Sequence, residues 1–318
     1  VISVQTAWLK NYYPIEFMAA LMTSVIDNSA KAAEYLYSCK EMGIKVLPPD
    51  VNVGQGEFTA EKGSVRYGLY ANKSLGRPVI DKIITEREEN GAYKTLSDFI
   101  ERTAERDVNK RAIENLIKAG ALDSLEGTRK QMTMVYTSIV DNVLREKKTG
   151  MSGQMSLFDL VPEDEKSSYE IKFPDVGEFD KEVALAFEKE VLGIYLSGHP
   201  LEEYIDKMKN NVTAGAIDFV MDEETGTVKV KDNAHVVIGG MISSKTIKFT
   251  KNNKTMAFFT IEDLTGTVEV IVFPRDYEKY QRYIQDDAKV FVVGHATVDE
   301  EQNGKVICER IVSFDDTE

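Results

Sequence analysis

The sequence predicts a multidomain α+β protein in which a helical first part is followed by a small β-barrel. Apolar residues recur at helical spacing over much of residues 5–208, and from Ala234 onward apolar and polar residues alternate as they do in strands. This change of period separates the two parts, because a pattern that suits a helix does not suit a strand.

Breaking residues divide the first part into its elements. Residues 5–45 are helical in pattern, and the helix that starts at Ser29 is expected to end at Gly43 as a C-cap. Residues 57–71 alternate instead, with a turn at Lys62-Gly63, which predicts a β-hairpin. Further helices are expected over residues 78–90, 96–100, 110–118, 129–147, 178–197 and 202–208.

The second part holds five candidate strands, with one helix of about residues 275–284 between the third and the fourth. This order of elements is that of an OB-fold, a small five-stranded barrel. The strands are expected at His235–Phe249, Thr255–Glu262, Thr267–Phe273, Ala288–Val298 and Gly304–Phe314.

Length and composition are those of a globular protein of two or three domains. The 318 residues are 42% hydrophobic and 29% charged, and no apolar run approaches the roughly 18 residues that suggest a membrane span. The formal net charge of −14 argues against nonspecific nucleic-acid binding by the whole surface, so any DNA contact is expected in local basic patches. We expect no membrane partner and a cytoplasmic location.

The cysteines and the first residues indicate the cellular environment of the chain and its relation to a longer polypeptide. Cys39 and Cys308 stand far apart without metal-ligand spacing, which is typical of buried, reduced thiols in a cytosolic protein. The first residues, 1–6, include neither Met nor a basic leader, and we therefore expect a fragment of a longer polypeptide.

Catalysis finds little support in the residues. The histidines His199, His235 and His295 are scattered, without Cys or carboxylate at ligand spacing, and the adjacent acids Glu262-Asp263 and Asp315-Asp316 are typical of turns. We expect no catalytic residue, no metal site and no cofactor on this chain. An enzyme with an unrecognised site among the acids is the alternative, which metal-dependent activity of the purified chain would support.

A turn before an amphipathic helix is the first candidate DNA contact. The segment Lys73-Ser74-Leu75-Gly76-Arg77 resembles a helix-hairpin-helix turn, in which backbone N–H groups and the helix N-terminus meet a DNA phosphate. Ser74 replaces the first glycine of that motif, and simple helix packing is the alternative. A second turn, at residues 119–122, departs further from the motif and is open to a purely structural interpretation.

A lysine cluster is the second candidate DNA contact. Residues 245–254 contain no acid, and we expect them in the first loop of the barrel, where OB-folds bind single strands by stacking and phosphate contacts. The alternative is a solvated turn. Phe258 and Phe259 should point to opposite faces, one into the core and one outward, while Tyr277 and Tyr280 should anchor their helix. The candidate residues are Lys245, Lys248, Phe249, Lys251 and Lys254.

The pentapeptide Gln154-Met155-Ser156-Leu157-Phe158 places three apolar side chains in a stretch that is otherwise linker-like. Apolar side chains on a polar linker cost solubility unless they dock. A glutamine followed by Leu-Phe resembles the peptide by which bacterial replication proteins bind the sliding clamp, with the amide bonding backbone and Leu157 and Phe158 filling an apolar cleft. A small strand or a satellite of the core is the alternative.

Several segments together resemble the C-family of bacterial replicative polymerases, the DNA polymerase III alpha subunits. They occur in the family's order and extend over nearly the whole chain. The segments are residues 5–21 (QTAWLKNYYPIEFMAAL), 47–52 (LPPDVN), 109–111 (NKR), 116–123 (LIKAGALD) and 192–201 (LGIYLSGHPL).

The resemblance implies a role for each part of the chain. The catalytic carboxylates and divalent metal of the family belong to a palm domain upstream, so the chain should not extend a primer alone, although the intact subunit would be a DNA-directed DNA polymerase. The implied partners are primer–template duplex, single-stranded template, the sliding clamp and other replisome subunits. A free-standing nucleic-acid-binding module is the alternative. The implied parts are the end of the fingers domain with its β-hairpin (1–72), a tandem helix-hairpin-helix region (73–148), a linker with the clamp-binding peptide (149–177), a helical connector (178–232) and the OB-fold (233–318).

Overall fold

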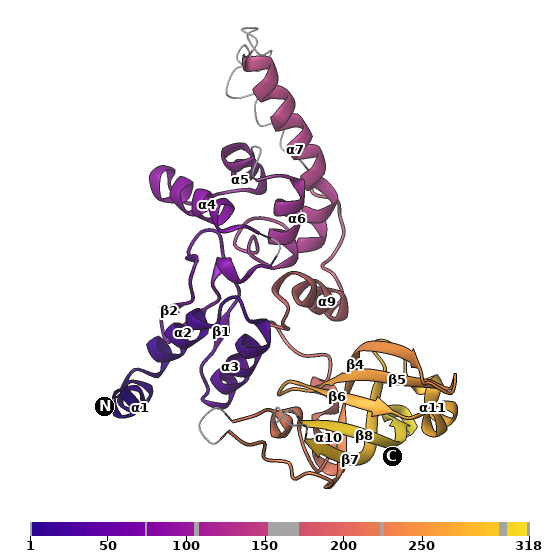
Figure 1. Cartoon of the computed structure of the whole chain (residues 1–318). Coiled ribbons are helices and arrows are strands. Elements are labelled where there is room, and N and C mark those ends of the chain that lie inside the picture. Colours follow the sequence, from indigo (N-terminus) through magenta and orange to yellow (C-terminus); the bar gives the residue numbers. More distant parts are fainter. Residues whose placement is uncertain are drawn as a thin grey trace. The chain divides into compact units, whose positions relative to one another are not determined.

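The computed structural model describes residues 2–73, 75–104, 108–151, 172–222, 226–298 and 304–316. The chain forms two compact units, Val1–Gly198 and His199–Glu318 (Figure 1). The boundary falls within the predicted connector, because the two ends of that connector bury their apolar residues in different cores. Leu192 packs into a core of the first unit, and Phe219 packs into the barrel core of the second.

The first unit begins with three helices and a small sheet. Its strands are ordered β1-β3-β2, with β1 parallel and β2 antiparallel to β3, so the predicted hairpin is confirmed. The predicted end of the third helix is also confirmed, since Gly43 has a left-handed φ of +70°. The elements are α1 (Ile2–Tyr12), α2 (Pro14–Ser24), α3 (Ser29–Glu41), β1 (Val46–Leu47), β2 (Thr59–Glu61), β3 (Ser64–Arg66) and the 3₁₀ turn η1 (Leu69–Ala71).

Four helices of the first unit share one apolar core. Thr95 and Asn109 cap two of them, with side-chain oxygens that accept from the backbone N–H groups of Asp98 and Ala112. The core also contains Val51 and Leu69, which precede these helices in the chain. The helices are α4 (Arg77–Asn90), α5 (Leu96–Thr103), α6 (Lys110–Lys118) and α7 (Arg129–Met151), and α9 (Lys181–Leu192) follows them.

The second unit is the predicted five-stranded closed barrel, preceded by short helical segments. The strand order is β4-β5-β6-β8-β7, and α11 lies between the third and fourth strands in sequence, as an OB-fold requires (Figure 1). The elements are η4 (Glu202–Tyr204), α10 (Ile205–Asn211), η5 (Ala216–Phe219), β4 (His235–Phe249), β5 (Thr255–Glu262), β6 (Thr267–Val272), α11 (Pro274–Tyr280), η6 (Gln281–Tyr283), β7 (Lys289–Val298), β8 (Gly304–Ser313) and η7 (Phe314–Asp316).

The first strand of the barrel extends further than a loop interpretation of residues 245–254 allows. β4 and β5 pair up to Phe249 and Thr255, so the loop is confined to residues 250–254. Lys245, Lys248 and Phe249 therefore lie on a strand, which corrects their placement in the first loop. The reason is the paired register of the two strands, which continues past the part of β4 that covers the barrel core.

Within the described ranges, every helix is too short or too polar to cross a lipid bilayer.

Candidate nucleic-acid interface

The outer face of the barrel carries partly exposed side chains between buried ones. On β5, Ala257, Phe259 and Ile261 are 0%, 2% and 1% exposed, and Phe258 between them is only partly buried. The prediction that these two phenylalanines face opposite ways is thus confirmed, with Phe259 in the core. Phe258 presents its ring to the outside of the barrel.

Lys248 lies against the ring of Phe258. Its ammonium nitrogen is 4.8 Å from the ring centroid. The register pairs Lys248 with Met256 and Thr246 with Phe258, so lysine and phenylalanine are diagonal neighbours on one face. A cation above an aromatic face is attracted by the ring quadrupole. The arrangement holds a positive charge beside an aromatic surface, which is the pairing that single-stranded nucleic acid needs for phosphate and base.

Two isoleucines extend the surface of Phe258 across the barrel. Phe258 pairs with Ile271 on β6, and Ile271 pairs with Ile307 on β8. All three are partly exposed, and they alternate with buried neighbours such as Val270 and Val306. The β5–β6–β8 face therefore has an apolar row on its outside. We call Lys248, Phe258, Ile271 and Ile307 the outer row.

The tip of the β4–β5 hairpin adds charge and a further aromatic ring. Lys251 and Lys254 are exposed on the turn, which is closed by the backbone N–H of Thr250 donating to the carbonyl of Lys254 at 2.8 Å. Phe249, at the end of β4, is 71% exposed. These side chains project from the hairpin, where a passing strand could reach them.

Lys245 has a different environment from the other lysines. Its ammonium donates to Gln285 Oε1 at 3.0 Å and lies 3.7 Å from a carboxylate oxygen of Asp286. Since Lys245 and Lys248 are an odd number of residues apart on one strand, their side chains leave it on opposite faces. The lysines of residues 245–254 therefore do not form a single surface.

The tyrosines of the α11 region are placed as predicted. Tyr277 and Tyr280 are partly buried and pack against the barrel core, where they anchor their helix.

The predicted helix-hairpin-helix turn leads into α4. Ser74 lies outside the described residues, and Leu75 packs against the core of the first unit. Gly76 is the N-cap of α4 and gives it no side-chain cap. Pro78 has no backbone N–H, and the N–H of Val79 donates to the carbonyl of Gly76 at 3.0 Å, so few backbone donors of this first turn are left for a ligand. Arg77 lies 3.3 Å from a carboxylate oxygen of Asp27, with its guanidinium carbon 5.2 Å from the centroid of Tyr70.

The second turn, at residues 119–122, uses backbone N–H groups for hydrogen bonds within the protein. The backbone N–H groups of Ala119, Gly120 and Ala121 all donate to carbonyl oxygens of α6. Gly120 has a φ of +75°, and a Cβ there would lie 2.2 Å from Nη2 of Arg129. These three N–H groups are thus already bonded, and the side chain of Arg129 fills the space beside Gly120.

Arg129 joins three parts of the first unit, and sequence reasoning missed this. Its guanidinium contacts Asp123 Oδ2 at 2.7 Å and Glu188 Oε1 at 3.3 Å. Glu188 is 1% exposed, and its other oxygen accepts from the backbone N–H groups of Leu196 and Ser197, each at 2.9 Å. A signal was present: Glu188 lies on the apolar face of α9, three residues from Val191.

Two of the histidines are closer together than the sequence indicated. His235 on β4 pairs directly with His295 on β7, with ring centroids 5.4 Å apart, and His295 Nδ1 is 3.0 Å from Glu309 Oε1. The expectation that the histidines are scattered was wrong for this pair, because the antiparallel register joins distant positions. Across the described ranges, no group of three or more His, Cys, Asp or Glu residues could hold a metal ion.

The candidate clamp-binding residues, Gln154 to Phe158, lie outside the described residues. Their role therefore stays a prediction.

Two known families match the helical region and the barrel of this chain, one each. Residues 43–132 match the family described as the helix-hairpin-helix motif. Residues 236–313 match the family described as an OB-fold nucleic acid binding domain. Among solved structures, a domain of replication protein A from Methanococcus maripaludis is 10% identical over 27% of this chain and 89% of its own, with a TM-score of 0.23.

Curated relatives match nearly the whole chain. DNA polymerase III subunit alpha of Mycobacterium tuberculosis is 39% identical over 295 residues, which are 92% of this chain and 24% of the relative. The same subunit of Borreliella burgdorferi is 34% identical over 316 residues, 99% of this chain and 27% of the relative. The subunit of Thermus aquaticus is 35% identical over 303 residues, which are 95% of this chain and 24% of the relative.

The chain thus spans about a quarter of the length of the curated relatives that it matches. The likeness nevertheless runs through both units, and it includes the helix-hairpin-helix region and the barrel. By this agreement along almost all of its residues, the chain belongs to the family of bacterial DNA polymerase III alpha subunits.

Proposed function

We propose that this chain is the DNA-handling and clamp-tethering part of a replicative DNA polymerase III alpha subunit. In the intact subunit it supports processive, template-directed DNA synthesis. The observation that carries the DNA-handling role is the outer row of the barrel, where Lys248 lies 4.8 Å from the centroid of Phe258 beside two partly exposed isoleucines.

The outer row suits a single strand of nucleic acid. A base can stack on the ring of Phe258 or on the exposed ring of Phe249, and each such stack is worth about 1–3 kcal/mol. Lys248, Lys251 and Lys254 can meet phosphates without reading sequence, because phosphate contacts position a protein and carry no base information. The barrel therefore acts on template of any sequence.

The turn before α4 suits a duplex backbone. Lys73 precedes α4 and Arg77 is its first residue; no side chain caps this N-terminus, and the first turn of the helix contains no acid. Backbone N–H groups at a helix N-terminus attract phosphate through their own donors and the helix dipole. This turn would follow the duplex while the barrel follows the single strand.

The clamp-binding peptide would supply the tether. Burial of Leu157 and Phe158 in an apolar cleft is worth roughly 1.5–3 kcal/mol for each side chain, which is weak binding by itself. Joined to a DNA-binding module, the same contact becomes intramolecular and gains from effective concentration. The contribution of this chain is thus positional: it keeps the polymerase at the primer end.

A binding experiment with three components tests the proposal. Affinity of the 318-residue chain is measured for a primed template, for the clamp alone, and for the clamp loaded on the primed template. We expect the loaded clamp to bind at least about a hundredfold more tightly than either component, because two linked weak contacts gain roughly 10²–10⁴ in avidity.

The matched variants separate the two contacts. Leu157→Ala with Phe158→Ala should remove clamp binding and the avidity gain, and leave affinity for the primed template unchanged. Leu160→Ala with Val161→Ala, two apolar residues on the same stretch outside the pentapeptide, should change neither. Unchanged clamp binding by the first pair would refute the tether, and absence of template binding by the wild-type chain would refute the DNA-handling role.

A further inference from the structure

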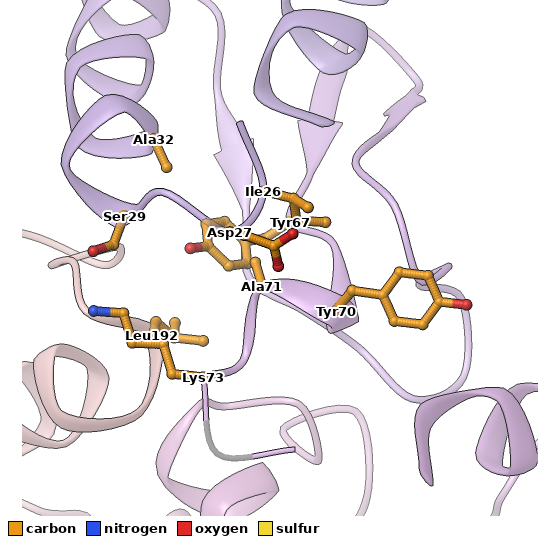
Figure 2. A pocket seen from close by; sticks show the side chains of 9 residues that line it. All are labelled: Ile26, Asp27, Ser29, Ala32, Tyr67, Tyr70, Ala71, Lys73 and Leu192. Carbon is orange, nitrogen blue, oxygen red and sulfur yellow. The ribbon is translucent and has the colours of Figure 1, made fainter. Parts of the chain in front are cut away.

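A pocket in the first unit is lined in part by the polar side chains of Tyr67 and Lys73, which do not hydrogen-bond to each other. Its volume is about 260 Å³, and it lies where the start of α3, the segment around η1 and the end of α9 meet (Figure 2). Sites for drug-sized ligands measure about 300–1,000 Å³. The pocket is therefore suited to one chemical group of a larger molecule, or to a small ion.

Tyr67 brings a buried hydroxyl to the pocket. The residue is 1% exposed, and its ring packs edge-on against Phe58 with centroids 4.8 Å apart. Figure 2 shows the hydroxyl directed toward the side of the pocket where Ser29 and Lys73 lie. Among the described residues this hydroxyl has no hydrogen-bond partner. The oxygen is not fully enclosed, so it opens onto the pocket and can donate to a ligand there.

Burial also keeps the Tyr67 hydroxyl protonated. It raises the pKa of Tyr67 far above its ordinary value. The group therefore stays protonated at any physiological pH, and it meets a ligand as an O–H donor.

Lys73 brings a positive charge to the same side of the pocket. Its backbone N–H donates to the carbonyl of Val191 at 3.0 Å, which fixes the residue beside the end of α9. Its ammonium extends past Gly193, where φ is +77° and a Cβ would lie 2.3 Å from the nitrogen. Within the described part of the chain, this ammonium has neither an ion-pair nor a hydrogen-bond partner.

The start of α3 supplies a third attraction for a negative charge. Ser29 is the first residue of this 13-residue helix, and its hydroxyl lines the pocket. The first N–H groups of a helix lack intrahelical partners, and the helix dipole is positive at this end. The side chain of Asn28 accepts from one of them, the backbone N–H of Lys31, at 3.2 Å, so the donors left for a ligand are those of the first two residues, Ser29 and Ala30. Asp27 is the opposing charge in the lining; its carboxylate forms an exposed ion pair with the guanidinium of Arg77 at 3.3 Å, which offsets that charge only in part.

We propose that this pocket binds a phosphate group, with the hydroxyl of Tyr67, the ammonium of Lys73 and the N-terminus of α3 as donors. A phosphate offers three strong acceptor oxygens to such a set. The inference rests on the proposed function in one respect, because we assign the phosphate to a DNA backbone that follows the adjacent turn to Arg77. The same chemistry could come from free phosphate, and the two sources are distinguished below.

The first measurement uses inorganic phosphate and no DNA. Binding to the 318-residue chain in chloride buffer is followed by ³¹P NMR at constant ionic strength. Tyr67→Phe and Lys73→Gln should each weaken phosphate binding by about tenfold or more, the effect of losing one hydrogen bond to a charged group. Lys45→Gln, an exposed lysine on the same unit, is the charge-matched control and should bind like wild type. Phosphate binding that is equal in all four proteins would overturn the proposal.

The second measurement uses a labelled duplex of 20 base pairs over a range of sodium chloride concentrations. Lys73→Gln should lower affinity and reduce the salt slope by about 0.9, since one counterion fewer is released. Tyr67→Phe should lower affinity without changing the slope, because its hydroxyl is neutral. That split would not follow from a merely structural role for Tyr67.

The two measurements separate this proposal from the proposed function. If the variants weaken phosphate binding but not duplex binding, the pocket stands and its ligand is a free phosphate. If duplex binding is strong and neither variant affects either ligand, DNA handling stands and the pocket is rejected. Folding is checked by thermal unfolding: Tyr67→Phe loses no internal hydrogen bond and keeps the ring against Phe58, so its midpoint should match or exceed that of wild type.

Discussion

Lys248 and Phe258 stand on neighbouring strands with the lysine ammonium 4.8 Å from the ring centroid, on the outside of the barrel. Lys245, on the same strand, instead donates to Gln285 at 3.0 Å. Two lysines that look equivalent in the sequence therefore have different chemical environments. One is combined with an aromatic surface, and the other fastens the strand to the segment after η6.

This difference predicts different effects on single-strand binding. Phe258→Ala should lower affinity for an oligothymidylate by about 1–3 kcal/mol through lost stacking. Lys248→Ala should lower affinity and reduce the salt slope by about 0.7. Lys245→Ala is the matched control, and fluorescence anisotropy over a salt series should give a slope like that of wild type. Equal effects of the two lysine variants would contradict the assignment of the outer row.

The ion pairs of Arg129 and Arg77 predict contrasting effects on stability. Arg129→Met leaves the carboxylate of Glu188, which is 1% exposed, without its cation, and loss of one partner of a buried pair costs about 3–5 kcal/mol. Arg77→Met breaks a pair whose side chains are 58% and 82% exposed, and such pairs contribute at most about 1 kcal/mol. Urea unfolding followed by helical circular dichroism measures both. A destabilisation by Arg129→Met no larger than that of Arg77→Met would argue against a buried network.

Substitution of Gly120 by alanine should cost more stability than its left-handed backbone conformation alone explains. Gly120 and Gly43 both have left-handed φ values, +75° and +70°, but a Cβ at Gly43 meets nothing within 4 Å. Gly43→Ala should therefore cost about 1–2 kcal/mol for the left-handed conformation alone. Gly120→Ala should cost more, because its methyl group displaces the guanidinium of Arg129. The same urea titrations give both values, and equal costs would mean that Arg129 moves aside freely.

The two cysteines predict a thiol titration. Burial raises the pKa of Cys39 to about 11 and is the main cause that raises that of Cys308 to about 12. The native thiols are therefore protonated at pH 8, and the thiolate is the reactive form. A disulfide reagent should label neither cysteine in the native chain and both in denaturant. Rapid native labelling would show that one of them is accessible, which its burial of 0–1% exposure excludes.

The periodicity of the sequence was sufficient for most of the fold. Alternation from His235 predicted the strands of the barrel, and Asn109 and Gly43 predicted where helices begin and end, because capping and pleating are local properties of the backbone. The opposite orientations of Phe258 and Phe259 followed from the same rule. The candidate site is harder to predict from the sequence, because the lysine-rich residues 245–254 look like one loop, whereas part of them lies on β4.

Sequence alone determined the order of the elements, the family, and the residue types available for binding DNA. Only the tertiary structure decided which of them meet: that Lys248 faces Phe258, that Lys245 is held elsewhere, that His235 pairs with His295, and that Ser29, Tyr67 and Lys73 line one pocket. The physical reason is that local conformation depends on neighbours in the chain. Contacts across strands depend in addition on the register of the paired strands, and contacts between residues dozens of positions apart, such as His235 with His295, depend on how the whole core packs.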